Sequence, residues 1–191
     1  MTICVGILSG EGIVIAADTE EGDGDTKRDQ QKLFNFCGGV PHPESDIPPE
    51  TSGILTGAGD AGYLDAFFYL LSKGAVNHVE MDDFEKYMAD ETVFFHDRHI
   101  FPISSRDQTP RIMSVLAAIT CGWKTALFVT NGSTVRKVYT HIAIGIGQPF
   151  AQTILNQQTW CQTMKRGAVA CRIRYIRHKG PGSVGGVSVS N

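Results

Sequence analysis

The feature that most constrains the fold is a pair of short apolar segments at the start of the chain. Residues 2–8 read TICVGIL and residues 13–17 read IVIAA, with the turn residues SGEG between them. Two apolar runs around a glycine-containing turn predict a β-hairpin. Because both runs are almost continuously hydrophobic, we expect the strands to be covered on both faces. The fold must therefore supply packing layers on either side of this hairpin.

The rest of the chain predicts strands and helices in contiguous blocks. Further strands are expected at residues 32–36, 53–56, 112–120, 125–130, 134–139, 142–146 and 184–189. Helices are expected at residues 63–71, from Asp82 or Asp83 toward His96, at 150–164 and at 168–176. This order favours layered α+β packing over a parallel βαβ sheet. The Pro- and Gly-rich loop at 38–52 has too little chain before it for a separate core, so residues 1–191 are expected to form a single domain.

Composition excludes several classes of function. A formal net charge of -3 gives no electrostatic reason to expect binding to nucleic acid or to an anionic membrane. No apolar run approaches the roughly 20 residues that a membrane-spanning helix needs. The five cysteines are odd in number and show no C-x-x-C spacing, which indicates reduced, buried thiols. We therefore expect a cytoplasmic protein with no membrane partner.

Four segments carry a family resemblance. They are TICVGILSGEGIVIAAD from Thr2, TGAGDA from Thr56, HIAIGIGQPFA from His141 and VGG from Val184. In this order they resemble the N-terminal-nucleophile (Ntn) hydrolases of the proteasome β-subunit type, including the bacterial peptidase that works with a ring ATPase. In those proteins a mature N-terminal Thr begins a strand, and a hairpin returns to an Asp; here Asp18 lies 16 residues after Thr2. The resemblance implies a four-layer αββα sandwich, with two antiparallel sheets between helix layers.

The resemblance makes Thr2 the expected nucleophile. An alcohol needs a base to take its proton, and in this class the base is the chain's own α-amino group. An α-amine titrates near ~8, which suits a general base at neutral pH. The amine is free only if nothing precedes Thr2, and because Thr2 is small we expect methionine aminopeptidase to remove Met1.

Three further residues complete the expected catalytic site. Asp18 closes a buried strand, where an unpaired carboxylate is costly, and the family pairs this Asp with a Lys beside the Thr hydroxyl. Lys32 fits that role, although its separation from Thr2 is two residues shorter than is usual, and Lys27 is the alternative. Gly57 is expected to supply the backbone N–H of an oxyanion hole.

Two departures weigh against full activity. Ile146 stands where the family has a Ser that helps to position the N-terminal amine. The Asp and Ser usually found around the final Gly-Gly strand are also absent, with Ser183 and Ser188 nearby but not in clear register. His96 and His99 have no third ligand near them in the sequence, so we expect no metal site, and no motif indicates a cofactor.

These inferences lead to one expected function and two alternatives. We expect a threonine-type hydrolase that cleaves peptide bonds, with a peptide or protein as substrate. We also expect a homo-oligomeric ring, with an ATPase as a candidate partner. The alternatives are a catalytically impaired proteasome-like scaffold subunit and an Ntn amidohydrolase that acts on a small amide.

Overall fold

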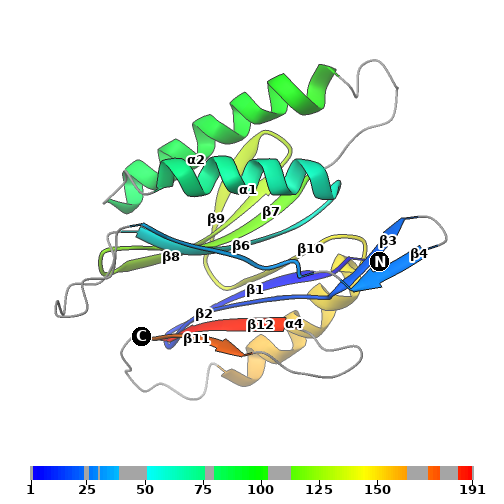
Figure 1. Ribbon diagram of the computed structural model, residues 1–191. Helices are drawn as coiled ribbons and strands as arrows, with labels where there is room; N and C mark the ends of the chain where they lie inside the picture. The colour runs from blue at the N-terminus through cyan, green and yellow to red at the C-terminus, as the bar shows by residue number, and fades with distance from the viewer. Residues whose placement is uncertain are drawn as a thin grey trace.

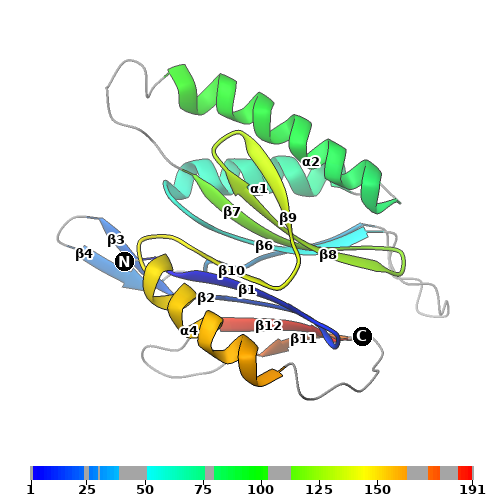
Figure 2. The same ribbon diagram turned by 180° about the vertical axis from the view of Figure 1, so that it is seen from behind.

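Two antiparallel sheets stacked face to face form the centre of the protein. The computed structural model describes residues 2–23, 26–29, 31–38, 51–75, 80–102, 113–162, 172–176 and 185–190. The first sheet has the strand order β10-β1-β2-β12-β11 and the second has the order β5-β6-β7-β8-β9. Helices lie on the outer face of each sheet (Figures 1 and 2). The expected αββα layering and its antiparallel sheets are confirmed.

The first sheet contains the N-terminal hairpin. Its strands are β1 (Cys4–Ser9), β2 (Gly12–Ala17), β10 (His141–Ile144), β11 (Arg172–Ile176) and β12 (Gly185–Ser190). Ile13 and Ile15 are fully buried against the second sheet, whereas Val14, on the opposite face of β2, is 37% exposed. The expectation that both faces of the hairpin are covered therefore holds only for the inner face. On the outer face, α4 (Gln148–Gln162) packs mainly along β10 and leaves part of β2 exposed.

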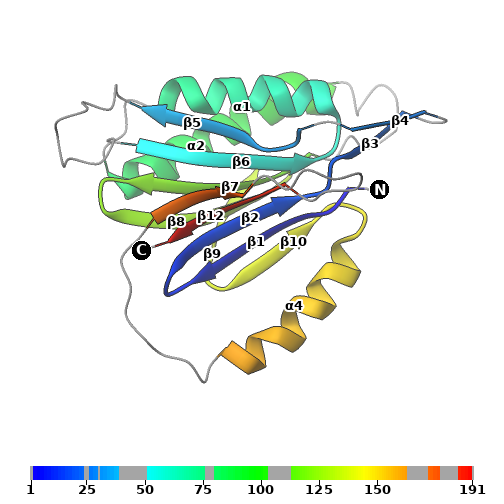
Figure 3. The same cartoon turned by 60° about the horizontal axis from the view of Figure 1, so that its bottom comes forward.

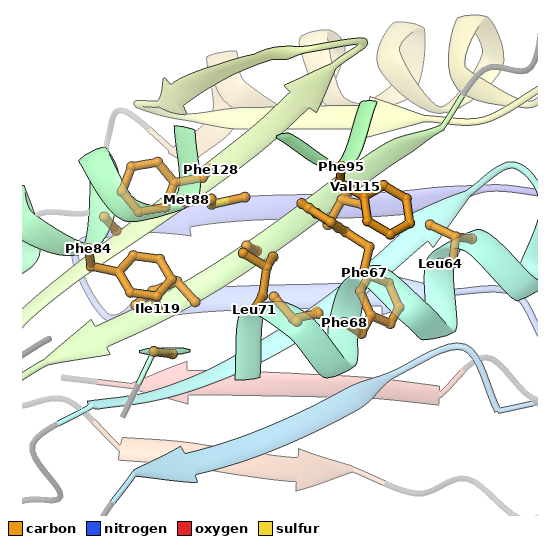
Figure 4. Close-up of a cluster of buried hydrophobic side chains, with 14 of the residues drawn as sticks. Leu64, Phe67, Phe68, Leu71, Phe84, Met88, Phe95, Val115, Ile119 and Phe128 are labelled. Atoms are coloured by element: carbon orange, nitrogen blue, oxygen red, sulfur yellow. The ribbon is translucent and has the colours of Figure 1, made fainter. Parts of the chain in front are cut away.

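The second sheet carries the larger core. Its strands are β5 (Phe34–Gly38), β6 (Thr51–Ala58), β7 (Ser114–Cys121), β8 (Lys124–Asn131) and β9 (Thr134–Val138). Helices α1 (Ala61–Ala75) and α2 (Met81–Phe95) cover its outer face, and a π-helical segment (His96–Ile100) continues α2. Side chains at helical spacing on α1 and α2, among them Phe67, Leu71 and Phe84, pack against sheet residues such as Phe128 of β8 (Figure 4).

Three local predictions differ from the structure. The helix expected at residues 168–176 is wrong at its end, because Arg172–Ile176 forms β11 and pairs with β12, while residues 168–171 lie outside the described ranges. The polar stretch after Asp18 forms a hairpin, β3 (Glu20–Asp23) and β4 (Thr26–Asp29), that local polarity did not indicate. Helix α2 begins at Met81 after Glu80, not after Asp82 or Asp83, so both aspartates lie in its first turn, where negative charge is favourable.

The β3–β4 hairpin extends from the end of the sandwich at which the N-terminus lies (Figure 3). Within the described ranges, no helix is both long and apolar enough to cross a membrane. Of the three cysteines whose surroundings are described, Cys4 and Cys121 are buried free thiols as expected, but Cys37 is exposed. Cys37 lies on β5, the edge strand of its sheet, which explains its exposure.

Candidate functional site

The N-terminal hairpin brings Thr2 and Asp18 to the same end of the first sheet. Cys4 pairs with Ala17, so the residues just before β1 lie opposite those just after β2. The Asp18 amide donates to the Ile3 carbonyl at 3.0 Å, and the Ile3 amide donates to Asp18 Oδ1 at 3.2 Å. These two bonds continue the hairpin pairing by one step and hold the carboxylate beside the backbone of Thr2.

Lys32 joins this pair from the other sheet. Its Nζ donates to Asp18 Oδ1 at 3.0 Å and to Thr2 Oγ1 at 3.4 Å. The Lys32 and Asp18 side chains are only 13% and 25% exposed. Lys32 precedes β5, and Leu33 between them is buried against the first sheet, which anchors the lysine at the junction of the two sheets. The structure thus brings together a hydroxyl, an ammonium and a carboxylate that are far apart in the sequence.

Gly57 is linked to the start of β1 through Cys4, which lies two residues after Thr2. It is near the end of β6, and the Cys4 thiol donates to its carbonyl at 3.3 Å. The Thr56 hydroxyl in turn donates to Cys4 Sγ at 3.4 Å. A Cβ on Gly57 would lie 2.3 Å from Leu64 Cδ2 and 3.0 Å from the Ser114 carbonyl oxygen, so glycine lets α1 pack closely on β6 without a shift of Leu64. The oxyanion role of its N–H stays a prediction.

Burial raises the pKa of the Cys4 thiol to about 11, against which the hydrogen bond from Thr56 acts to lower it. The Asp18 carboxylate adds to the increase, and Lys32 opposes it. The thiol is therefore neutral at physiological pH and acts as a hydrogen-bond donor. It is a fully buried core residue, and its high pKa makes it a poor nucleophile.

The turn between β10 and α4 holds the backbone of Thr2. The Gly147 amide donates to the Thr2 carbonyl at 3.2 Å. Gly145 has φ +92, and a Cβ there would lie 2.3 Å from the Thr2 carbonyl oxygen. Ile146, between the two glycines, is 78% exposed. The two glycines of this turn, spaced two residues apart, were the available sequence signal for its contact with the Thr2 backbone.

Two other sequence candidates, Lys27 and Ser188, lie within strands β4 and β12. Lys27 is on β4, opposite Gly22. Ser188 pairs with Val14 in the middle of β2, whereas Gly185 pairs with Ala17 next to Asp18. Ser183 lies outside the described residues. The final Gly-Gly therefore borders the site, and Ser188 does not.

His96 and His99 lie in the π-helical segment that follows the C-terminal end of α2. His96 Nδ1 is 3.7 Å from Asp97 Oδ1, and the His99 ring lies 4.7 Å from that of Phe95. Among the described ranges, no cluster of His, Cys, Asp and Glu has the composition of a metal site.

Comparison with solved structures identifies the fold. The chain is similar to Anbu (ancestral beta-subunit) from Yersinia bercovieri, with 15% identity and a TM-score of 0.62, over 81% of this chain and 65% of that one. It is similar to an Anbu (Gly-1) mutant from Hyphomicrobium sp. strain MC1, with 16% identity and a TM-score of 0.62, over 82% and 65% of the two chains. The chain has a proteasome-like fold. No family model and no curated protein sequence matches it.

A third similar structure is described as the helical assembly of the Anbu complex from Pseudomonas aeruginosa, with 18% identity, a TM-score of 0.62 and coverage of 81% and 65%. This chain spans about two thirds of the length of each of these proteins. The assignment to the proteasome β-subunits and the ATPase-linked bacterial peptidase is corrected by these findings. The three structures named above are Anbu proteins, and at 15% to 18% identity they share the fold with this chain at a distance.

Proposed function

We propose that this chain is an N-terminal-nucleophile hydrolase that cleaves amide bonds, with Thr2 as nucleophile once Met1 is removed. The observation that carries the proposal is the contact of Lys32 Nζ with both Thr2 Oγ1, at 3.4 Å, and Asp18 Oδ1, at 3.0 Å. A positive charge beside a hydroxyl favours its deprotonated form, and Asp18 keeps the ammonium in place. An ordinary strand residue has no need of a half-buried ion pair at its hydroxyl.

The proposed reaction follows from this arrangement. Thr2 Oγ1 attacks the carbonyl carbon of the scissile amide while its proton passes to the free α-amine of Thr2. The carbonyl oxygen takes up the negative charge and is stabilised by the Gly57 N–H. The amide C–N bond then breaks, and the α-ammonium protonates the departing amine. Water, deprotonated by the same α-amine, hydrolyses the resulting ester and regenerates Thr2.

A second candidate is a proteasome-like scaffold that keeps the fold without cutting. The observation in its favour is Ile146, which is exposed and offers no hydroxyl to the amine. The backbone bond from Gly147 to the Thr2 carbonyl still seats the strand start. In the enzyme reading, losing one hydrogen-bonding side chain lowers the rate by at most ~10²–10³-fold.

We further propose a homo-oligomer, because one similar structure is described as a helical assembly. Exposed apolar side chains on one stripe of α4 and the turn before it, Ile146, Phe150 and Ile154, provide surface for such contacts. A ring architecture, an ATPase partner and a cytoplasmic location stay predictions. Light scattering of the purified protein measures the mass of the assembly. A monomeric mass across the accessible concentration range contradicts the proposed homo-oligomer.

The test of the proposed function combines intact mass with an active-site probe. Mass spectrometry of the purified protein is expected to show loss of Met1. Incubation with a peptide epoxyketone, which bonds to both the hydroxyl and the amine of an N-terminal Thr, is expected to add one probe per chain. The matched control is Thr2→Ala, which keeps the free amine and removes the hydroxyl. Retained Met1, or an unmodified wild-type chain, supports the scaffold instead.

Substrate class needs a separate measurement. A panel of fluorogenic peptides and small amides, each assayed with wild type and Thr2→Ala, measures which bonds are cut. Peptide cleavage that disappears in the variant supports a peptidase. Cleavage of small amides alone supports the amidohydrolase alternative.

A further inference from the structure

Three buried threonines of the described residues form hydrogen bonds within their own helix or sheet, and a fourth bonds across the two sheets. Among the residues whose burial is described, the buried polar ones are Thr51, Thr56, Thr92 and Thr130. Thr92 bonds to Met88 of its own helix, and Thr130 bonds to the backbone of Val115 in the same sheet. Thr51 bonds to Cys121, its neighbour on the adjacent strand.

Thr56 is the threonine whose hydrogen bond crosses the interface, because its hydroxyl donates to a residue of the other sheet. Its partner, Cys4 Sγ, lies at 3.4 Å on β1, whereas Thr56 lies on β6. The core residues around Cys4 are otherwise apolar. A hydroxyl placed there gains little over a valine methyl for stability, because it must first be desolvated. Its place in this interface calls for another explanation.

The pair attaches to the strand segment that carries the expected oxyanion donor. The Thr56 hydroxyl donates to Cys4 Sγ, and the Cys4 thiol donates to the Gly57 carbonyl at 3.3 Å. The two attachment points on β6 flank the peptide group that contains the Gly57 N–H. On the opposite side of β6, the Leu64 side chain of α1 packs against Gly57 and limits movement of this residue away from Cys4. Cys4 lies two residues after Thr2 on the same chain segment.

We propose that Cys4 and Thr56 are positioning residues that hold the Gly57 peptide in register with Thr2 across the two sheets. This inference rests on the proposed function, in which Thr2 attacks and the Gly57 N–H stabilises the oxyanion. Without the pair, β1 and β6 still pack through apolar contacts, which resist sliding less well than directional bonds. Misplacement of a donor by a fraction of an ångström lowers transition-state stabilisation while substrate binding is retained.

Thr56→Val tests the inference, because it preserves shape and removes the hydroxyl. We expect kcat for a fluorogenic peptide to fall roughly tenfold with KM unchanged. The inhibition constant of a peptide aldehyde, whose adduct places an oxyanion at the same site, is expected to rise by the same factor. Thr56→Ser restores the hydroxyl and is expected to recover most of the rate. The melting temperature of Thr56→Val is expected to equal or exceed that of wild type.

The chain offers a matched control in Thr51, which lies on β6 like Thr56 but at the end of the strand away from Thr2. Thr51 is also buried, and its hydroxyl bonds to Cys121 on the adjacent strand β7. Thr51→Val is expected to leave kcat and aldehyde affinity unchanged. If Thr56→Val does not fold, Cys4→Val against Cys4→Ser decides, since serine keeps both hydrogen bonds and valine keeps neither. The serine variant is then expected to be the more active by at least about fivefold.

The outcomes separate the two proposals. A wild-type chain that reacts with the epoxyketone, together with a Thr56→Val variant of wild-type kcat and aldehyde affinity, overturns the positioning role alone. Equal losses in Thr56→Val and Thr51→Val also overturn it, because they indicate a general packing effect. A wild-type chain that does not react refutes the proposed function and this inference together.

Discussion

Replacing Lys32 with methionine removes the positive charge that lies 3.4 Å from Thr2 Oγ1. The variant keeps most of the aliphatic stem, so the packing beside Leu33 is largely preserved. If Thr2 is the nucleophile, the charge on its oxygen during attack loses its nearest counter-charge. The rate of the chemical step is therefore expected to fall.

The separation sets the scale of this loss. Two unit charges 3.4 Å apart attract by about 5 kcal/mol at an effective dielectric constant of ~20, and by about 1 kcal/mol in bulk water. The Lys32 side chain is 13% exposed, which places the interaction between these limits, and Asp18 offsets part of it. A loss of about 3 kcal/mol corresponds to roughly 10²-fold in rate.

The assay is the second-order rate of epoxyketone adduct formation, followed by mass spectrometry, together with kcat/KM for a fluorogenic peptide. Because the variant leaves the Asp18 carboxylate without its amine partner, its free energy of unfolding is measured in parallel. Lys27→Met is the control, since Lys27 was the alternative lysine and lies on β4. A Lys32→Met variant that folds and reacts within about twofold of wild type refutes the electrostatic reasoning, and a loss confined to Lys27→Met reverses the assignment.

Two further predictions concern stability. Burial raises the pKa of the Cys4 thiol from 9.0 to about 11. The contribution of this group to the free energy of unfolding is therefore fully present below pH 9 and is lost as the pH rises through about 11. Urea unfolding between pH 8 and 11 should show a decline of about 2 to 3 kcal/mol in the free energy of unfolding from this group. The total decline is expected to be smaller in Cys4→Ala, and an equal decline in wild type and variant contradicts the prediction. Gly145→Ala places a Cβ 2.3 Å from the Thr2 carbonyl oxygen and is expected to cost on the order of 3 kcal/mol. Gly132→Ala also adds a Cβ at a positive φ, +59, but with open space around it, so a Gly145→Ala cost no larger than that of Gly132→Ala in denaturant melts contradicts a clash with Thr2.

Much of the fold was predictable because its signals are local. The hairpin over β1 and β2, the hairpins at Cys121-Gly122 and Asn131-Gly132, and the helical spacing in α1 depend on neighbouring residues. Element ends were less predictable, and β11 was mistaken for a helix. Residues 172–176 form a strand because they pair with β12, which lies further along the chain, and local sequence does not show that pairing.

The position of Asp18 opposite Ile3, and hence next to Thr2, follows from the sequence of the hairpin alone. Hairpin register follows from the turn, so a fixed number of residues places the acid opposite the strand start. The contact of Lys32 with both groups, and the bonds from Cys4 to Thr56 and Gly57, were decided by the tertiary structure. They cross from one sheet to the other, and the stacking of two sheets depends on packing summed over many side chains. Local residue patterns do not reveal that sum. The family resemblance could therefore name the expected site residues, but the contacts between the two sheets became visible only once the sheets were stacked.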